Sequence, residues 1–423
     1  MDLRCAGQRA TEVRHPPARQ FVTYRRVKIF GRLQDLLYSL NVEHVHSLNF
    51  RRIEWCCQQG GITAEQLASD VGISVSTMQK VMQGGDVLTP SQLRKIASYF
   101  GRGVLFFLEP SAADEGKVYT TQFRTLANQK PHLSTKIKQI IQRAERQRAI
   151  YLSLREDLDD EERPRFVPPK IRGLDPRASA AVARTWLGIK DERTFDEYRA
   201  AVERRGLLVF RSNGYNGKWQ IPKENPILGF SLYDAECPLI VVKKQAAETR
   251  QTFTLMHELG HVLIHKSSSI DDEADLYSRE GQEREANAFA GYLLVPDENL
   301  TAINDDERPA EISQYDVWLE PQRTAWGVSG EVILRRLLDS GRLSDAQYNA
   351  YKNWRTATVR PPEDTGSRMY RHREPKHIFG NTFVRTVLDA LNAHQITLAR
   401  ASSYLDSLKI ADLHQLERHY ADH

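Results

Sequence analysis

The spacing of apolar residues predicts a mostly helical chain with a short sheet. Apolar positions recur every three or four residues over much of the sequence, which is the period of an amphipathic helix. Helices are predicted at Phe50–Gln59, Ala64–Val71, Val75–Met82, Pro176–Leu187, Phe195–Arg204, Thr252–His265 and Gln282–Leu294. Short β-branched and aromatic runs predict strands at Leu207–Phe210, Ile227–Leu232 and Leu239–Val242. The expected fold class is therefore mainly α with a small β-sheet (α+β).

Breaks in this pattern divide the 423 residues into five expected parts. Residues 1–42 form a basic lead, residues 43–110 a compact all-α domain, and residues 111–172 a helical linker with prolines near its end. Residues 173–350 form the domain that contains the strands. Residues 351–423 form a helical C-terminal region without an assigned role, which contains a Pro-, Arg- and Gly-rich break at 356–378 and a last helical piece at 381–420. The length suits two to three domains at roughly 150 residues each.

The formal net charge of +4 conceals an uneven distribution. Residues 1–172 carry +9 and residues 173–423 carry −5, which indicates an N-terminal part that faces nucleic acid. The sequence has no apolar run near the ~18 residues of a membrane span, and its first residues do not resemble a signal peptide. None of the four cysteines stands in a CxxC pair, which favours a reducing compartment. We expect a cytoplasmic protein without a membrane partner.

Residues 50–108 show the helix spacing of a helix-turn-helix domain. Thr63 is expected to cap the second helix, Gly72 to make the turn and Pro90 to open a fourth helix. The third helix, Val75–Met82, would enter the major groove of double-stranded DNA. Polar side chains around it suit base edges and phosphates, so the candidate DNA-binding residues are Thr63, Ser74, Ser76, Thr77, Gln79 and Lys80.

This region resembles the XRE (Cro-like repressor) family over about 60 residues. It differs from the charge pattern of a strong DNA-binding domain, because the domain is charge-neutral and its third helix contains no Arg. We therefore expect modest phosphate affinity from the domain itself, with the basic flanks supplying further charge. The alternative is a four-helix module that binds protein.

The strongest chemical signal is the HExxH sequence within Thr254–His261. His257 and His261 are four residues apart, so on a helix they lie on one face and can hold one Zn²⁺. Glu258, beside the first histidine, would act as the general base on water and later pass the proton to a leaving amine.

A third ligand is expected from the alanine-rich helix Gln282–Leu294. Ala286 and Ala290 share a face with Glu283 and would let this helix approach the HExxH helix closely. Two His and one Glu leave a fourth position open, as in a catalytic zinc site. Glu285 is the rival ligand, although it projects about 200° away from Glu283 around the helix.

The run Arg250–His265, followed by Glu283-x-x-Ala-Asn-x-Phe-Ala-x-x-Leu-Leu-x-Pro296, resembles the ImmA/IrrE family of metallopeptidases. The resemblance covers about residues 175–350. It implies a zincin-like, gluzincin-type domain, a zinc-dependent endopeptidase activity, and Glu283 as the ligand. Members of the family are known for cutting helix-turn-helix repressors. Residues 118–158 resemble the region that joins the two domains in fused XRE–ImmA/IrrE proteins.

These features predict a DNA-binding transcriptional regulator with zinc-dependent endopeptidase activity. Its protein substrate would be a helix-turn-helix repressor or its own linker near Arg163–Gly173. The alternative is a transcription factor whose metallopeptidase-like domain is a non-catalytic sensor or a toxin–antitoxin-type protein-binding module. A sensor does not need the base Glu258, which favours the enzyme. For oxyanion stabilisation the sequence offers Tyr277, Tyr292 and His265 without choosing among them.

Overall fold

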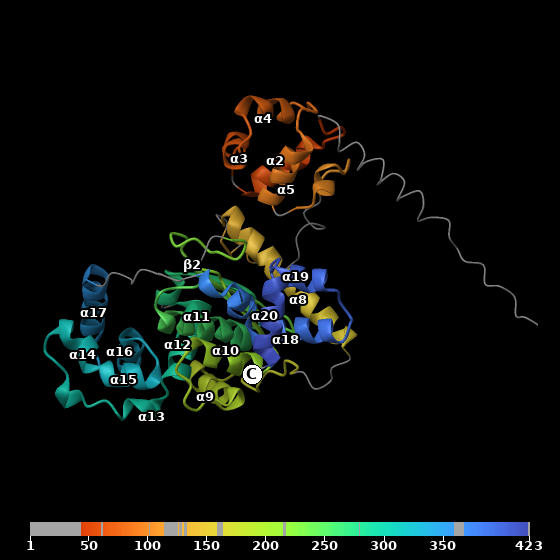
Figure 1. The fold of residues 1–423 in the computed structure, drawn as a ribbon. Coiled ribbons are helices and arrows are strands. Elements are labelled where there is room, and N and C mark those ends of the chain that lie inside the picture. Colours follow the sequence, from red (N-terminus) through yellow and green to blue (C-terminus); the bar gives the residue numbers. More distant parts are fainter. Residues whose placement is uncertain are drawn as a thin grey trace, which may run out of the picture. The chain divides into compact units, whose positions relative to one another are not determined.

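The chain folds into two compact units, Met1–Ala113 and Asp114–His423 (Figure 1). The computed structural model describes residues 44–60, 62–100, 102–113, 126, 129–130, 133–158, 164–214, 217–278, 280–358 and 368–421. The basic lead predicted at residues 1–42 lies outside the described residues. The fold is mainly α with a small mixed sheet, as the apolar pattern predicts.

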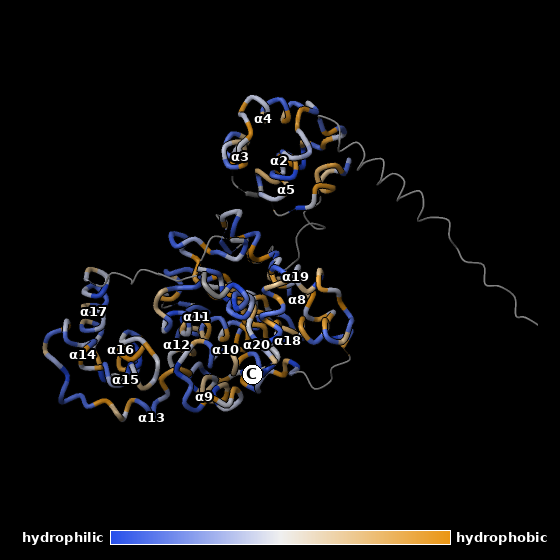
Figure 2. The backbone as a smooth tube through the Cα atoms, in the orientation of Figure 1, coloured by the Kyte–Doolittle hydropathy of each residue, from blue (hydrophilic) through white to orange (hydrophobic). Residues whose placement is uncertain are grey.

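The first unit is a set of short helices around one core. It contains α2 (Phe50–Gly60), α3 (Ala64–Val71), α4 (Val75–Met82), α5 (Pro90–Tyr99) and the 3₁₀ turn η1 (Val104–Phe107). Polar and apolar residues are interspersed along these helices (Figure 2), and the apolar side chains form one buried core. The buried core includes Leu67, Ala68, Val71, Ile73, Met78 and Val81.

Capping side chains fix the turn between α3 and α4. The Thr63 hydroxyl accepts a hydrogen bond from the Gln66 amide at 3.2 Å, and the Gln66 side chain accepts one from the Thr63 amide at 2.8 Å. Gly72 ends α3 with φ of 65°, a left-handed conformation that glycine adopts without strain. Ser74 then caps α4 by accepting a hydrogen bond from the Thr77 amide. The Thr63 and Ser74 hydroxyls thus accept hydrogen bonds from backbone amides that have no partner within the helix, and Gly72 allows the chain to turn between the two helices.

The second unit is built on a four-stranded sheet with the order β1-β3-β2-β4. Its strands are β1 (Leu208–Arg211), β2 (Ile227–Leu232), β3 (Leu239–Val242) and β4 (Ser269–Asp272). β1 runs parallel to β3, and β2 runs antiparallel to both β3 and β4. The sequence did not predict β4, because Ile270 is the one apolar residue among its four and no alternation marks it.

Helices surround this sheet (Figure 1). Those that precede or flank the strands are α8 (Thr135–Asp157), α9 (Pro176–Leu187), α10 (Phe195–Glu203), α11 (Glu248–Gly260), η2 (His261–His265) and α12 (Gly281–Leu294). A helical segment follows, with α13 (Asp297–Leu300), α14 (Tyr315–Trp318), α15 (Glu320–Trp326), α16 (Gly330–Asp339) and α17 (Asp345–Thr358). The C-terminal helices are α18 (Glu374–Asn392), α19 (Leu398–Tyr404) and α20 (Ile410–Ala421). Short 3₁₀ turns connect them at η3 (Asp275–Tyr277), η4 (Asp305–Glu307), η5 (Ile312–Gln314) and η6 (Arg368–Arg373).

Two predicted helices differ in detail. The helix predicted at Thr252–His265 begins earlier, at Glu248, and its last turn, η2, has the wider π-helical pattern. The C-terminal helical piece predicted at 381–420 is three helices, and the first begins at Glu374, inside the predicted break. Pro375 occupies the first turn of that helix, where its missing N–H costs nothing.

Helix α8 packs within the second unit, against α18 and β3. Its buried face contains the predicted residues Ile137, Ile140, Ile141, Ala144 and Leu154. The Lys136 ammonium donates to the Gln220 side chain at 2.9 Å, and Gln147 donates to the Tyr404 carbonyl at 3.0 Å. The helix predicted as a linker is therefore part of the second unit's framework.

The C-terminal helix α18 is held on α10 by a buried ion pair. Arg199 and Glu203, both on α10, are each 3% exposed and lie 3.3 Å apart. The Arg199 guanidinium donates to the carbonyls of His377 and Ile378, and the Thr382 amide and hydroxyl donate to Glu203. These contacts make residues 374–382 an integral part of the second unit.

Side chains from the segment before α8 cover the outer edge of β4. The Gln129 side chain donates to the Ser268 carbonyl at 2.9 Å and accepts from the Ile270 amide at 3.2 Å. Lys130 pairs with Asp272 at 2.8 Å and with Asp275 at 2.7 Å. The edge strand next to the candidate site is thereby closed by contacts within the same unit.

Among the described residues, we find no helix with the length and apolar content to cross a membrane.

Candidate metal centre

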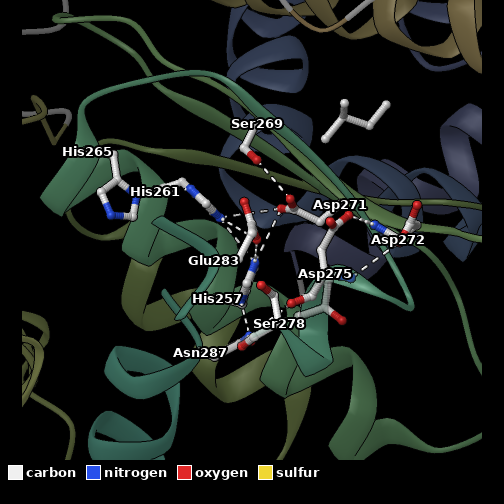
Figure 3. Close-up of polar contacts among 12 residues, drawn as sticks. His257, His261, His265, Ser269, Asp271, Asp272, Asp275, Ser278, Glu283 and Asn287 are labelled. Atoms are coloured by element: carbon white, nitrogen blue, oxygen red, sulfur yellow. Dashed lines mark hydrogen bonds and ion pairs between the residues drawn. The ribbon is translucent and has the colours of Figure 1, made fainter. Parts of the chain in front are cut away.

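Four side chains from four elements converge beside the sheet (Figure 3). His257 comes from α11, His261 from the first position of η2, Glu283 from α12 and Asp271 from β4. One donor atom of each lies within 4.8 Å of the others, and Glu283 is the most exposed of the four. The structure thus brings together the three predicted ligands and adds Asp271, which the sequence analysis missed.

Close packing of α11 against α12 sets this arrangement. Gly260 faces Ala286, and a Cβ added at Gly260 would lie 3.2 Å from the Ala286 Cα. Ala286 and Ala290 are both buried, as their spacing with Glu283 predicts. Small residues on both helices therefore let the Glu283 carboxylate come within 3.2 Å of His257 and 3.4 Å of His261.

The Ala286→Leu variant should lose metal affinity and stability together. The larger side chain would push α12 from α11 and carry Glu283 away from the histidines. Overpacking of this kind costs roughly 1–3 kcal/mol of stability. Thermal unfolding and zinc content of the purified variant measure both effects. The Gln282→Leu variant, at an exposed position of the same helix, should change neither, and equal behaviour of the two variants would contradict the packing argument.

The Nδ1 atom of each histidine has a partner, which leaves Nε2 facing the cluster. Nδ1 of His257 lies 2.9 Å from the Asn287 Oδ1, and Asn287 in turn donates to the Asp275 carbonyl at 3.0 Å. Nδ1 of His261 lies 3.0 Å from Nδ1 of His265. Such contacts orient metal-binding imidazoles and fix their tautomers. The sequence showed Asn287 one turn after Glu283 but did not indicate its contact with His257.

The rival ligand Glu285 lies elsewhere. Its carboxylate is 3.1 Å from Nε2 of His265, and it is absent from the cluster. His265 therefore connects Glu285 to His261, and burial lowers the pKa of His265. Of the other oxyanion candidates, Tyr292 carries the Arg336 guanidinium 3.7 Å from its ring centroid, and the side chain of Tyr277 lies outside the described residues.

Glu258 lies buried beside the cluster. Both of its carboxylate oxygens lack a hydrogen-bond partner among the described residues. Gly229 on β2 makes room for it, because a Cβ at Gly229 would lie 2.8 Å from the Glu258 Oε1. Gly229 is also paired in register with Asp271 on β4. The absence of a side chain at Gly229 therefore leaves space on the sheet for the Glu258 carboxylate.

The ionisable groups of the site shift one another's pKa values. Burial disfavours a charge on His257, but Asp271 and Glu283 outweigh it and raise its pKa to about 9. Burial, and then the charge of Asp271, raise the pKa of Glu258 well above its usual range. Burial also acts on Asp271, but His257 and His261 hold its pKa low. A cation that binds the imidazoles has to displace a proton, so its affinity should fall as the pH falls.

The donor set fits a divalent transition metal. Among the described residues, one oxygen each of Asp271 and Glu283 is buried without a hydrogen-bond partner, as are both oxygens of Glu258. Burying unpaired carboxylates is expensive, and a bound cation would offset that cost. Imidazole together with carboxylate is a ligand set that zinc takes readily.

Five of the six predicted DNA-binding residues lie on α4 or in its cap, and Thr63 caps α3. Ser76, Gln79 and Lys80 are exposed, whereas Met78 and Val81 on the other face are buried. The hydroxyls of Ser74 and Thr77 lie 2.7 Å apart in the cap of α4, and that of Thr63 caps α3. The exposed polar side chains of α4 are therefore Ser76, Gln79 and Lys80, and their contacts with DNA stay a prediction.

Sequence comparisons agree with the fold and with this geometry. Residues 53–107 match a helix-turn-helix family, and residues 203–338 match a peptidase family described as the IrrE N-terminal-like domain. The chain is 32% identical over 120 residues to "Uncharacterized immunity region protein 2" of Bacillus phage phi105, covering 26% of this chain and 75% of that protein.

Fold, site and comparisons define a helix-turn-helix protein that also carries a metallopeptidase-type domain. The chain belongs to the family in which an XRE-type helix-turn-helix domain is joined to an ImmA/IrrE-like peptidase domain.

Proposed function

We propose that this protein is a DNA-binding regulator with zinc-dependent endopeptidase activity. The observation that carries the proposal is the convergence of His257, His261 and Glu283 on one point, with the buried Glu258 beside them. A protein that used the fold only to sense a metal would not need an unpartnered carboxylate at that position. In this role His257, His261 and Glu283 hold the zinc.

Bound zinc would supply Lewis-acid chemistry to water and to the scissile carbonyl. Glu258 takes a proton from the attacking water and later gives it to the leaving amine. The raised pKa of Glu258 suits this task, because it makes the carboxylate a stronger proton acceptor than an exposed glutamate. Asn287 and His265 keep the two imidazoles in the orientation that points Nε2 at the metal.

A separate protein suits the substrate role better than the protein's own linker. In the predicted self-cleavage stretch, Phe166 and Ile171 are buried in the core of the second unit. The backbone at Arg165 and Phe166 also packs against Gly206, where an added Cβ would lie 2.3 Å from the Phe166 amide nitrogen. Binding this stretch as an extended peptide would require unpacking it first. We propose a helix-turn-helix repressor as the protein substrate.

The test is metal-dependent cleavage by the purified full-length protein. Candidate helix-turn-helix repressors are incubated with the zinc-loaded protein, with the chelator-treated protein, and with the treated protein after zinc is returned. We expect cleavage in the first and third samples and none in the second. Cleavage that survives chelation, or a zinc-loaded protein that cuts no member of a broad repressor panel, would refute the peptidase proposal.

Lys80→Ala should weaken DNA binding by a similar factor at every sequence. Lys80 is exposed on α4 and is proposed to contact a phosphate, so its loss should reduce the salt dependence of binding by about one counterion. Affinity measured over a range of salt concentrations tests this. Arg94→Ala removes an exposed charge from α5 instead, and an equal loss of salt dependence in both variants would contradict a specific role for α4.

A further inference from the structure

Asp271 is the one residue of the cluster to which the proposed function gives no role. Its side chain is 1% exposed, although it lies on the edge strand β4. One carboxylate oxygen, Oδ1, accepts a hydrogen bond from the Ser269 hydroxyl at 2.8 Å. The other, Oδ2, is directed at the two histidines and has no hydrogen-bond partner in the described part of the chain. A buried carboxylate oxygen without a partner is a costly feature to retain.

Five distances between the donor atoms of the cluster are close to those between the ligands of a tetrahedral metal site. Nε2 of His257 and Nε2 of His261 are 3.1 Å apart. Oδ2 of Asp271 lies 3.4 Å from His257 and 3.7 Å from His261, and Oε2 of Glu283 lies 3.2 and 3.4 Å from the same atoms. Tetrahedral ligands at zinc distances of 2.0–2.1 Å are separated by about 3.3 Å. Asp271 fits this spacing nearly as well as Glu283 does.

The charges agree with the distances. With neutral imidazoles, Asp271 and Glu283 bring two negative charges to the cluster, which one divalent cation would neutralise. A three-ligand site would leave Asp271 as a second buried carboxylate outside the ligand set, beside the unpartnered carboxylate of Glu258. If Asp271 binds the metal directly, the cation neutralises its buried charge. That charge then no longer acts on Glu258, to which the proton transfer is assigned.

We propose that Asp271 is a fourth protein ligand, so that the resting metal centre is closed to outside ligands. The inference rests on the proposed zinc site and goes beyond it. Zinc sites with four protein ligands are typical of structural centres, and catalytic sites keep one position open. Hydrolysis by this protein would therefore require that Asp271 leave the metal before water or a peptide carbonyl can approach.

The test measures access to the metal and does not depend on activity. Cobalt(II) replaces zinc in the full-length protein, and azide is titrated while the visible absorption of the cobalt is recorded. We expect the spectrum of the parent protein to resist azide. In Asp271→Ala, azide should bind and change the spectrum, and metal affinity should fall by more than the roughly 10- to 100-fold that loss of an outer partner costs.

Two further variants keep the result interpretable. Asp271→Asn preserves the size of the side chain and its contact with Ser269, so it serves if Asp271→Ala does not fold. Asp272→Asn makes the same change one position along β4, where the side chain pairs with Lys130, and it should resist azide as the parent does. Equal azide affinity in the parent and in both Asp271 variants would overturn the assignment of Asp271 as a ligand.

The two proposals fail separately. If azide binding follows the expected pattern but neither the parent nor any variant cuts a protein, the closed centre stands and the peptidase activity is wrong. If the parent cuts protein and binds azide as readily as the Asp271 variants do, the peptidase stands and the fourth ligand is wrong.

Discussion

Glu258→Gln is expected to abolish most proteolysis and leave the metal in place. The amide cannot accept the proton of the attacking water, and general acid–base catalysis of this kind contributes about 10²- to 10⁴-fold. The side chain is not among the four proposed ligands, and its two oxygens have no partner to lose among the described residues. Cleavage rates measured under saturating zinc, together with zinc content per chain, test both halves of this expectation.

A control separates this effect from a general loss of acidic charge. Glu280, directly before α12, is exposed and its side chain caps no backbone group. Glu280→Gln should therefore retain the parent rate. A Glu258→Gln protein that cuts as fast as the parent would show that another group serves as the base, and one that loses its zinc would show that Glu258 is a ligand.

Glu203→Ala should destabilise the second unit by about 3–5 kcal/mol, because it leaves the Arg199 charge buried without its ion-pair partner. It also removes the acceptor for the Thr382 amide and hydroxyl, which attach α18 to α10. Chemical denaturation followed by tryptophan fluorescence measures this, since Trp219 packs against Phe379 of α18 with ring centroids 5.2 Å apart.

The neighbouring residue gives the matched comparison. Arg204 ends the same helix, but its side chain is 58% exposed and lies 4.0 Å from Glu192. Arg204→Ala should change stability by no more than about 0.5 kcal/mol, as is usual for a surface substitution. Similar midpoints for Glu203→Ala and the parent would show that the buried ion pair does not hold the C-terminal helices.

The helices were predictable because their evidence is local. The boundaries of α3, α4 and α9 coincide with the predicted ones, since an apolar period and capping residues lie within a dozen positions of each other. Two strands, β2 and β3, are also as predicted, because both are mostly apolar and buried along their whole length. The helix-turn-helix and the HExxH helix were likewise predictable from residues that are close together in the sequence.

The rest of the site depends on contacts between distant segments. β4 has one apolar residue, so its place in the sheet comes from pairing with β2, about forty positions earlier. No local pattern therefore marks Asp271 as a strand residue, and the signal that the sequence contains is a pair of acidic residues between the two ligand helices. The contacts of Asn287 with His257 and of His265 with His261 likewise join residues whose mutual distance no sequence period fixes.

The Gln129 side chain binds the free edge of β4 through the same kind of hydrogen bonds that a neighbouring strand would make. Its amide N–H and carbonyl bind the Ser268 carbonyl and the Ile270 amide, the two backbone groups through which an incoming extended chain would pair. Gln129 and a fifth strand are therefore mutually exclusive at this edge. Any polypeptide that adds to the sheet beside Asp271 must first displace the Gln129 side chain, so addition of a chain and release of Gln129 are a single exchange.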